Sequence, residues 1–243
     1  MTPSKTSSFH ATRWTLVAQA GSETTDEETR REALGQLCQI YWTPLYVFAR
    51  RQGQKPEDAE DSVQSFMAAI LEQGVFDRAD SEKGRLRSYL IAAFRRFLAS
   101  QHRAHMAAKR SGGYQKVSIH AEDGERSGRW QVAALETPEQ AYHHRWACAL
   151  LEQSMERLRG EYAERDQSAV FEALCPLLTG NGETAAAAAT LKMREGTVRV
   201  AVSRMKRRLG LIVKEEVRAT LLPGEDLEDE LAELMGALGE ARG

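Results

Sequence analysis

The chain has few cysteines, few prolines and no long run of apolar residues. Its 243 residues include three cysteines and six prolines. Cys38, Cys148 and Cys175 are odd in number and far apart, which excludes a disulfide framework and a zinc knuckle of paired cysteines. No stretch approaches the roughly 18 consecutive apolar residues that a membrane span needs. The first residues also lack the apolar core and cleavage site of a secretory signal, so we expect a cytoplasmic protein.

The sequence also lacks catalytic motifs and complete sets of metal ligands. It contains no glycine-rich phosphate loop, no cofactor motif and no Ser/His/Asp set at a recognisable spacing. His144 with Cys148, and His102 with His105, have helical spacing, but neither pair has a second pair to complete four ligands. We therefore expect a protein that is not an enzyme and that holds no metal or cofactor.

Charge is nearly balanced overall but unevenly distributed. The formal net charge is -2, and 42% of the residues are hydrophobic, as in a soluble globular protein. Seven Lys/Arg and no Asp/Glu lie between residues 84 and 110, and a second basic block covers 192–214. Acidic segments lie at 23–32 and 215–240. Because a single block is usually a solvated helix face, it is the presence of two basic blocks that favours a polyanionic partner.

Apolar residues recur at helical spacing along most of the chain, which predicts an all-α fold. Over 56–74, Pro56 suits a first helical turn and Gly74 suits a stop. One buried stripe of this helix is predicted to consist of Val63, Phe66, Met67, Ile70 and Leu71. Asp58, Asp61 and Gln64 fall outside that stripe, where a partner can reach them.

The helix expected over about 84–107 has an apolar face and a basic face. The apolar face consists of Leu86, Leu90, Phe94, Phe97 and Leu98. Arg85, Arg96 and Arg103 lie opposite, with Tyr89 among them, which is the pattern of a surface for phosphates and bases. Arg87 does not fit this division, because it projects toward the apolar side.

A glycine-containing segment at 112–136 interrupts the periodicity and is expected to be a linker between domains. Helical pattern resumes at Thr137, which forms a predicted capping box with Gln140, and Pro138 suits the first turn. The core face of this helix is predicted to consist of Trp146, Leu150, Leu151, Met155 and Leu158.

Two further segments predict a helix-turn-helix. "ETAAAAATLKM" is a short helix of strong helix formers, and a three-residue turn leads into a second helix that begins near Gly196. The buried face of this second helix consists of Val198, Ala201, Val202, Met205 and Leu209. Its other face carries Arg199, Ser203, Lys206 and Arg207, with Arg204 at the margin, which is the pattern of a recognition helix in a DNA major groove.

These motifs resemble those of bacterial RNA polymerase sigma factors of the extracytoplasmic-function subfamily, in particular the variants frequent in planctomycete-type genomes. "DAEDSVQSFMAAIL" at 58–71 is similar to the polymerase-binding part of sigma region 2. The segment 76–113 looks like the part that melts and captures the −10 element, and 183–209 resembles the region 4 helix-turn-helix that recognises the −35 element. The helix-turn-helix alone is shared with many regulators, whereas both segments in this order are specific.

The resemblance implies a domain division and a set of contacts. It implies a disordered N-terminus (1–8), region 2 (9–111), a flexible linker (112–136), region 4 (137–222) and an acidic tail (223–243). Asp58, Asp61 and Gln64 would face the clamp helices of the polymerase β′ subunit. Single-stranded −10 DNA would follow Arg85, Tyr89, Arg96 and Arg103, and the −35 duplex would contact Arg199, Ser203, Arg204, Lys206 and Arg207.

Several alternatives stay open at this stage. We expect the acidic tail to be disordered, the alternative being a short helix that docks through Leu227, Leu231 and Leu234. A helix-turn-helix regulator that is not a sigma factor is the second functional hypothesis. A metal-dependent nuclease is disfavoured, because the carboxylates near Asp58 diverge within one helical turn. An anti-sigma partner, control of expression and inhibition by the tail are all compatible with the sequence.

Overall fold

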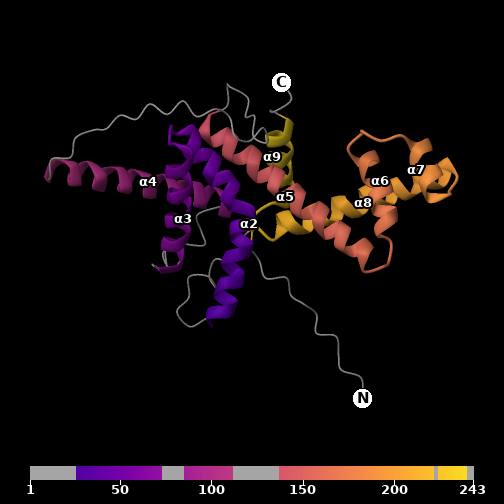
Figure 1. Cartoon of the computed structure of the whole chain (residues 1–243), viewed down its shortest axis with the longest axis horizontal. Coiled ribbons are helices and arrows are strands. Elements are labelled where there is room, and N and C mark those ends of the chain that lie inside the picture. Colours follow the sequence, from indigo (N-terminus) through magenta and orange to yellow (C-terminus); the bar gives the residue numbers. More distant parts are fainter. Residues whose placement is uncertain (1–25, 73–84, 112–136, 222–223, 240–243) are drawn as a thin grey trace, which may run out of the picture.

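A computed structural model describes residues 26–72, 85–111, 137–221 and 224–239. These parts of the chain form helices and contain no strand, which confirms the all-α prediction (Figure 1). The helices are α2 (Glu27–Arg51), α3 (Pro56–Glu72), α4 (Leu86–Ser111), α5 (Pro138–Ala163), α6 (Ser168–Leu178), α7 (Thr184–Leu191), α8 (Glu195–Arg218) and α9 (Leu227–Gly239).

Two of the described helices begin with favourable local signals. α3 begins at Pro56, and its acidic first turn lies at the positive end of the helix dipole. Asp26 caps α2 by accepting a hydrogen bond from the backbone N–H of Thr29 at 2.9 Å. The predicted stop at Gly74, the N-terminus and the linker at 112–136 lie outside the described residues.

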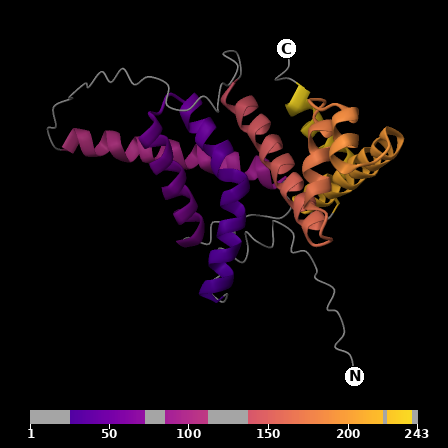
Figure 2. The ribbon, with the colours of Figure 1, turned by 45° about the vertical axis from the view of Figure 1, so that its right-hand side comes forward.

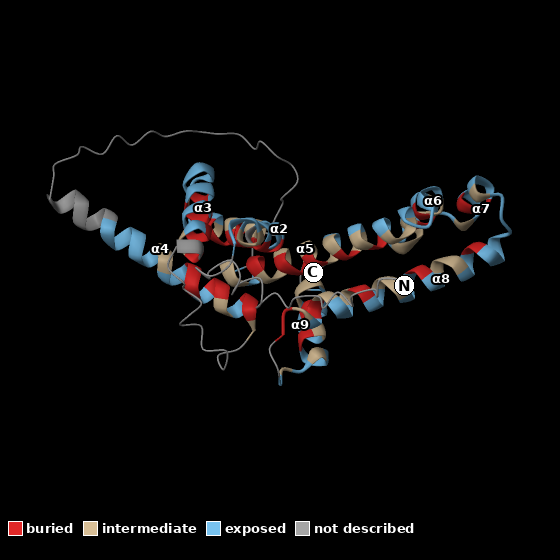
Figure 3. Ribbon diagram, turned by 90° about the horizontal axis from the view of Figure 1, so that it is seen from below, coloured by how far each residue is buried: buried red, intermediate tan, exposed pale blue. Residues whose placement is uncertain are grey.

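Two hydrophobic cores organise the helices. The N-terminal core is formed mainly by the apolar faces of α2, α3 and α4, with residues of α5, α8 and α9, and it includes Phe66, Leu90 and Phe94 from the predicted stripes. The helix-turn-helix core is formed by α6, α7, the first part of α8 and the end of α5, around Phe171, Val198 and Met205. Figure 3 shows buried residues alternating with intermediate and exposed ones along these helices.

α5 belongs to both cores. Its first half places Tyr142, Trp146 and Leu150 in the N-terminal core, and its second half places Leu158 in the helix-turn-helix core. In Figure 2 this helix lies between the α2–α4 bundle and the α6–α8 group. Because one continuous helix joins the two cores, the packing does not confirm a division into two domains that are separated only by a linker.

α8 runs antiparallel to α5 and is held by ion pairs. Arg157 of α5 contacts Glu215 and Glu216 near the end of α8, at 2.5 and 3.0 Å. Arg208, earlier in α8, pairs with Glu161 near the end of α5. The end of α8 therefore returns to the N-terminal core, where Val217 is fully buried.

The acidic tail contains a helix, so the preferred prediction of disorder was wrong for residues 227–239. α9 packs against α5 and α8, and Leu234 is buried in the N-terminal core with Leu227 and Leu231 packed at its margin. This is the docked arrangement that the sequence left as the alternative. The helix docks in spite of its charge because Glu228, Glu230 and Glu233 form ion pairs with arginine and lysine side chains of the same chain.

The capping box of α5 gives a first prediction. The Thr137 hydroxyl accepts from the Gln140 N–H at 3.2 Å, and the Gln140 side chain accepts from the Thr137 N–H at 2.9 Å. Thr137→Ala is expected to lower the free energy of unfolding by about 1 kcal/mol, measured by urea denaturation. Thr190→Ala in α7 is the control, because that hydroxyl only bonds back to the Ala186 carbonyl. Equal losses in both variants would contradict a specific role of the cap.

Candidate nucleic-acid interface

The turn between α7 and α8 fixes the start of the predicted recognition helix. α7 ends at Leu191, and Lys192 is its C-cap, whose left-handed backbone (φ 53°) lets its N–H bond back to the helix. Arg194 is the N-cap of α8 and makes no capping bond with its side chain, as expected from its residue type. Two residues separate this left-handed cap from the first residue of α8, so the path of α8 is set tightly by α7.

α8 buries one face and exposes the other. Val198, Met205 and Ile212 are fully buried, and Ala201, Val202 and Leu209 pack at the margin of the helix-turn-helix core. The five predicted recognition residues are all exposed: Arg199, Ser203, Arg204, Lys206 and Arg207. The structure therefore brings them together on one accessible face, and their contact with DNA stays a prediction.

A further arginine of α8 has a structural role instead. Arg208 donates two hydrogen bonds to Glu161 of α5, one of them from Nε at 2.8 Å. These bonds hold the pKa of the Glu161 carboxyl below its ordinary value. Arg208 therefore fixes α8 on α5, and the basic face of α8 is formed by its exposed neighbours.

The predicted basic face of α4 is only partly accessible. Arg96 and Arg103 are exposed, whereas Tyr89 is half-buried, and its burial raises the pKa of its phenol against the opposing charge of Arg96. Arg85, just before α4, is paired with two glutamates of α9, Glu230 and Glu233. The four predicted −10 residues are therefore not equivalent, and Arg85 already has anionic partners from the same chain.

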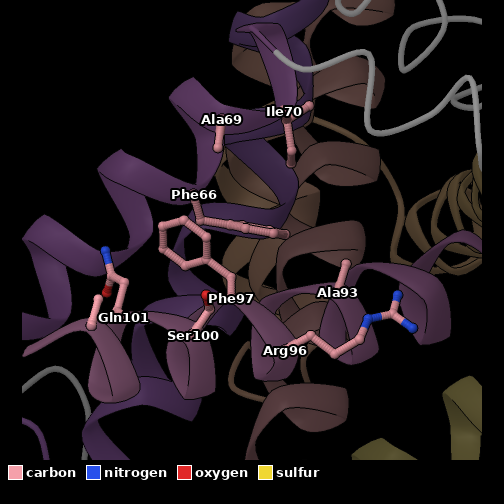
Figure 4. A pocket seen from close by; sticks show the side chains of 9 residues that line it. Phe66, Ala69, Ile70, Ala93, Arg96, Phe97, Ser100 and Gln101 are labelled. Atoms are coloured by element: carbon pink, nitrogen blue, oxygen red, sulfur yellow. The ribbon is translucent and has the colours of Figure 1, made fainter. Parts of the chain in front are cut away.

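A groove runs between α3 and α4 beside this basic face. It has a volume of about 480 Å³, and Phe66 and Phe97 lie together in it with ring centroids 5.5 Å apart (Figure 4). Arg96, Ser100 and Gln101 supply polar groups along its wall. Phe97 is partly exposed beside Arg96, and an aromatic surface bordered by a cation suits an unstacked base. The core assignment of both phenylalanines is confirmed, since Phe66 is buried in the N-terminal core and Phe97 packs against it. The groove itself was missed because spacing along one helix does not place two helices side by side.

The predicted polymerase-binding residues form an exposed acidic face on α3. Asp58, Asp61 and Gln64 are all exposed, and the neighbouring Ala59 and Val63 face the N-terminal core. The structure therefore agrees with the predicted orientation of α3, and the contact of these residues with polymerase stays a prediction.

Arg87, the residue that did not fit the pattern of α4, lies in a buried ion network. Its side chain is 5% exposed and donates to Glu230 from Nε at 2.7 Å and from Nη2 at 2.9 Å; Glu230 is 0% exposed. Glu233 accepts a further bond from Nη2, and the guanidinium lies 4.8 Å from the Trp146 ring centroid. Burial by itself would lower the pKa of Arg87, but the two glutamates outweigh it and raise that pKa.

The sequence contained one signal for this network. Arg87 is a charged residue on the predicted apolar face of its helix. Glu230 is likewise a charged residue among the leucines of α9. Charged residues that interrupt two apolar faces predict a buried pair only when the faces are known to meet. Since 143 positions separate the two residues, the pairing could not be derived from spacing.

His143 makes this network sensitive to pH. Its Nδ1 lies 2.8 Å from Arg87 Nη1, so the imidazole must be unprotonated to accept that bond. Burial, and then the charge of Arg87, lower the pKa of His143, against the opposing effects of Glu233, Glu230 and Glu139. Folding therefore favours neutral His143. Its contribution to stability is complete above the unfolded pKa of about 6.5 and is lost as the pH falls through that value toward the lower folded pKa.

This sign gives a second prediction. The free energy of unfolding should decrease between about pH 7 and pH 5, and His143→Asn, which keeps an acceptor but cannot titrate, should reduce that slope. Urea denaturation across this range measures it. His144→Asn is the matched control, because His144 faces Cys148 at 3.7 Å and not Arg87. An unchanged slope in His143→Asn would show that another group causes the pH dependence.

The described residues offer no metal-binding group and no helix that could cross a bilayer. No group of three or more His, Cys, Asp or Glu side chains is arranged there to hold a metal ion. Among the described helices, none combines the length and apolar composition that a bilayer crossing requires.

Comparison with known proteins adds no relative. No protein-family model, no curated protein and no solved structure matches this chain. What the site does must therefore be argued from its own residues.

Proposed function

We propose that this protein is a sigma factor of the extracytoplasmic-function kind, which binds core RNA polymerase and directs it to promoters. The observation that carries the proposal is the presence of two basic helix faces in one chain, on α4 and on α8, each positioned by its own hydrophobic core. A DNA-binding module with a single contact surface needs only one such face.

The two faces suit two forms of DNA. The exposed arginines and lysine of α8 can donate to guanine edges and to phosphates in a duplex major groove. On α4, Arg96 lines the aromatic groove and the same helix carries the exposed Arg103 and the half-buried Tyr89, a set that suits the backbone and unstacked bases of a single strand. The exposed acidic face of α3 is left for the polymerase β′ subunit.

The polymerase supplies the chemistry and part of the binding energy. Stacking contributes about 1 to 3 kcal/mol per base, which is too little to melt a duplex without assistance. The chain is also acidic overall, with a net charge of -2, so its attraction to DNA in isolation is weak. We expect the free protein to bind promoter DNA weakly and the complex with core polymerase to bind it tightly.

The test is run-off transcription from a library of host genomic fragments with purified core polymerase, with and without this protein. New discrete transcripts whose upstream regions share two sequence elements, near −35 and −10, would support the proposal. An active core enzyme that makes no new transcript with the wild type or with the Glu233→Gln variant described below would contradict it.

The second candidate is a helix-turn-helix regulator that works without polymerase binding. It shares the exposed face of α8 but gives no role to the basic face of α4 or to the acidic face of α3. Sedimentation equilibrium separates the two. A stable dimer that binds palindromic duplex DNA tightly without polymerase would favour the regulator.

A further inference from the structure

Helix α9 forms ion pairs with Arg85, the first residue of the predicted basic face of α4. Arg85 immediately precedes α4. Its Nε lies 2.9 Å from a carboxylate oxygen of Glu230 in an ion pair, and its Nη1 donates to Glu233. A carboxylate therefore occupies one nitrogen in each of the two forks, Nε/Nη2 and Nη1/Nη2, through which the Arg85 guanidinium can bind a phosphate. Arg85 cannot hold these glutamates and a DNA phosphate through the same nitrogens.

α9 is held in place by contacts with α4, α5 and α8. Leu234 is buried in the N-terminal core, Glu230 and Glu233 also pair with Arg87 of α4, and Glu228 contacts Lys214 of α8 at 3.3 Å. Figure 1 shows α9 beside α5, at the place where the α8 end of the chain returns to the α2–α4 bundle. The helix therefore fastens the C-terminal half of the chain to the start of α4.

We propose that α9 is an intramolecular inhibitor that competes with single-stranded nucleic acid for Arg85 and closes the start of the α4 basic face. The inference rests on the proposed function for its biological meaning, but the competition itself needs no polymerase. Glu233 is the accessible part of the contact, since its side chain is 51% exposed whereas Glu230 is buried. Displacement by a polyanion would begin at Glu233, because water and ions already reach it.

The test measures the affinity of the full chain for a fluorescein-labelled oligothymidylate by fluorescence anisotropy at low salt. Glu233→Gln removes one of the two carboxylates on Arg85 and keeps the buried Glu230–Arg87 pair. Coupling between two sites commonly changes affinity about 5- to 150-fold, and we expect Glu233→Gln to bind at least about 5-fold more tightly than the wild type. Deletion of α9 is not used, because it would leave Arg87 buried without its anionic partners.

The matched control is Glu228→Gln. It removes the same charge from the same helix but contacts Lys214 and not α4. We expect it to change the affinity less than about 2-fold, as a general charge effect would. The double variant Arg85→Ala/Glu233→Gln should lose most of the increase in affinity for the oligonucleotide, because the Arg85 guanidinium that Glu233→Gln releases is absent. Equal effects of the two glutamine variants, no gain in Glu233→Gln, or a full gain without Arg85 would each overturn the proposal.

The same variants separate this inference from the proposed function. If Glu233→Gln binds the oligonucleotide more tightly but no variant supports transcription, the inhibitory contact stands and the sigma function fails. If all variants transcribe equally and bind the oligonucleotide equally, the sigma function stands and the inhibitory contact fails.

Discussion

Arg199→Ala/Arg207→Ala is expected to reduce transcription from a promoter found in the run-off screen by at least about 30-fold, because each base or phosphate contact of this kind contributes about 1 to 3 kcal/mol. Both side chains lie on the exposed face of α8, outside the helix-turn-helix core. Alanine is a good helix former, so the fold should be retained. Run-off transcription with saturating core polymerase measures the effect, and thermal unfolding verifies the fold.

Arg165→Ala/Arg218→Ala is the control for this prediction. It removes the same two charges from exposed positions outside the recognition face. Under the proposed function its transcription should stay within about 3-fold of the wild type, as expected for a general electrostatic effect. A comparable loss in the control would mean that net charge, and not the face of α8, determines promoter binding.

Among the single substitutions considered, Arg87→Ala is expected to lower the free energy of unfolding most. Glu230 is 0% exposed, and Arg87→Ala would leave its carboxylate buried with less compensation. Breaking a buried pair from one side typically lowers the free energy of unfolding by about 3 to 5 kcal/mol. Urea denaturation followed by circular dichroism measures this loss, and α9 should be among the elements released.

Two further variants make the explanation specific. Arg95→Ala, on the same helix, removes an exposed pair with Glu139, and its cost should not exceed about 1 kcal/mol. Arg87→Met/Glu230→Met replaces the pair by apolar side chains of similar length and should recover most of the stability that Arg87→Ala loses. If Arg87→Ala were no more harmful than Arg95→Ala, the pair could not be a buried one.

The sequence predicted individual helices well because their signals are local. The capping box at Thr137, the start of α3 at Pro56 and the buried stripes of α3, α4 and α8 each depend on residues within a few turns of one another. The exposed sets on α8 and α3 follow from the same periodicity. Once the buried side of a helix is known, the helical spacing alone determines which residues lie on its exposed side.

The relations between distant segments were not predictable in the same way. The sequence suggested a disordered acidic tail, since charge counts describe a segment without its partners. In the structure the glutamates of α9 meet Arg85 and Arg87, so the same charges stabilise docking. The aromatic groove, the use of α5 by both cores and the burial of Arg87 likewise arise only when helices pack together.

The sequence by itself determined that the chain is helical, where its main apolar faces lie, and that α4 and α8 carry basic faces. The tertiary structure decided which of those basic residues remain accessible. Periodicity fixes the direction of a side chain on its own helix, but only long-range packing decides whether a charge faces water or, like Arg85 and Arg87, a carboxylate from the other end of the chain.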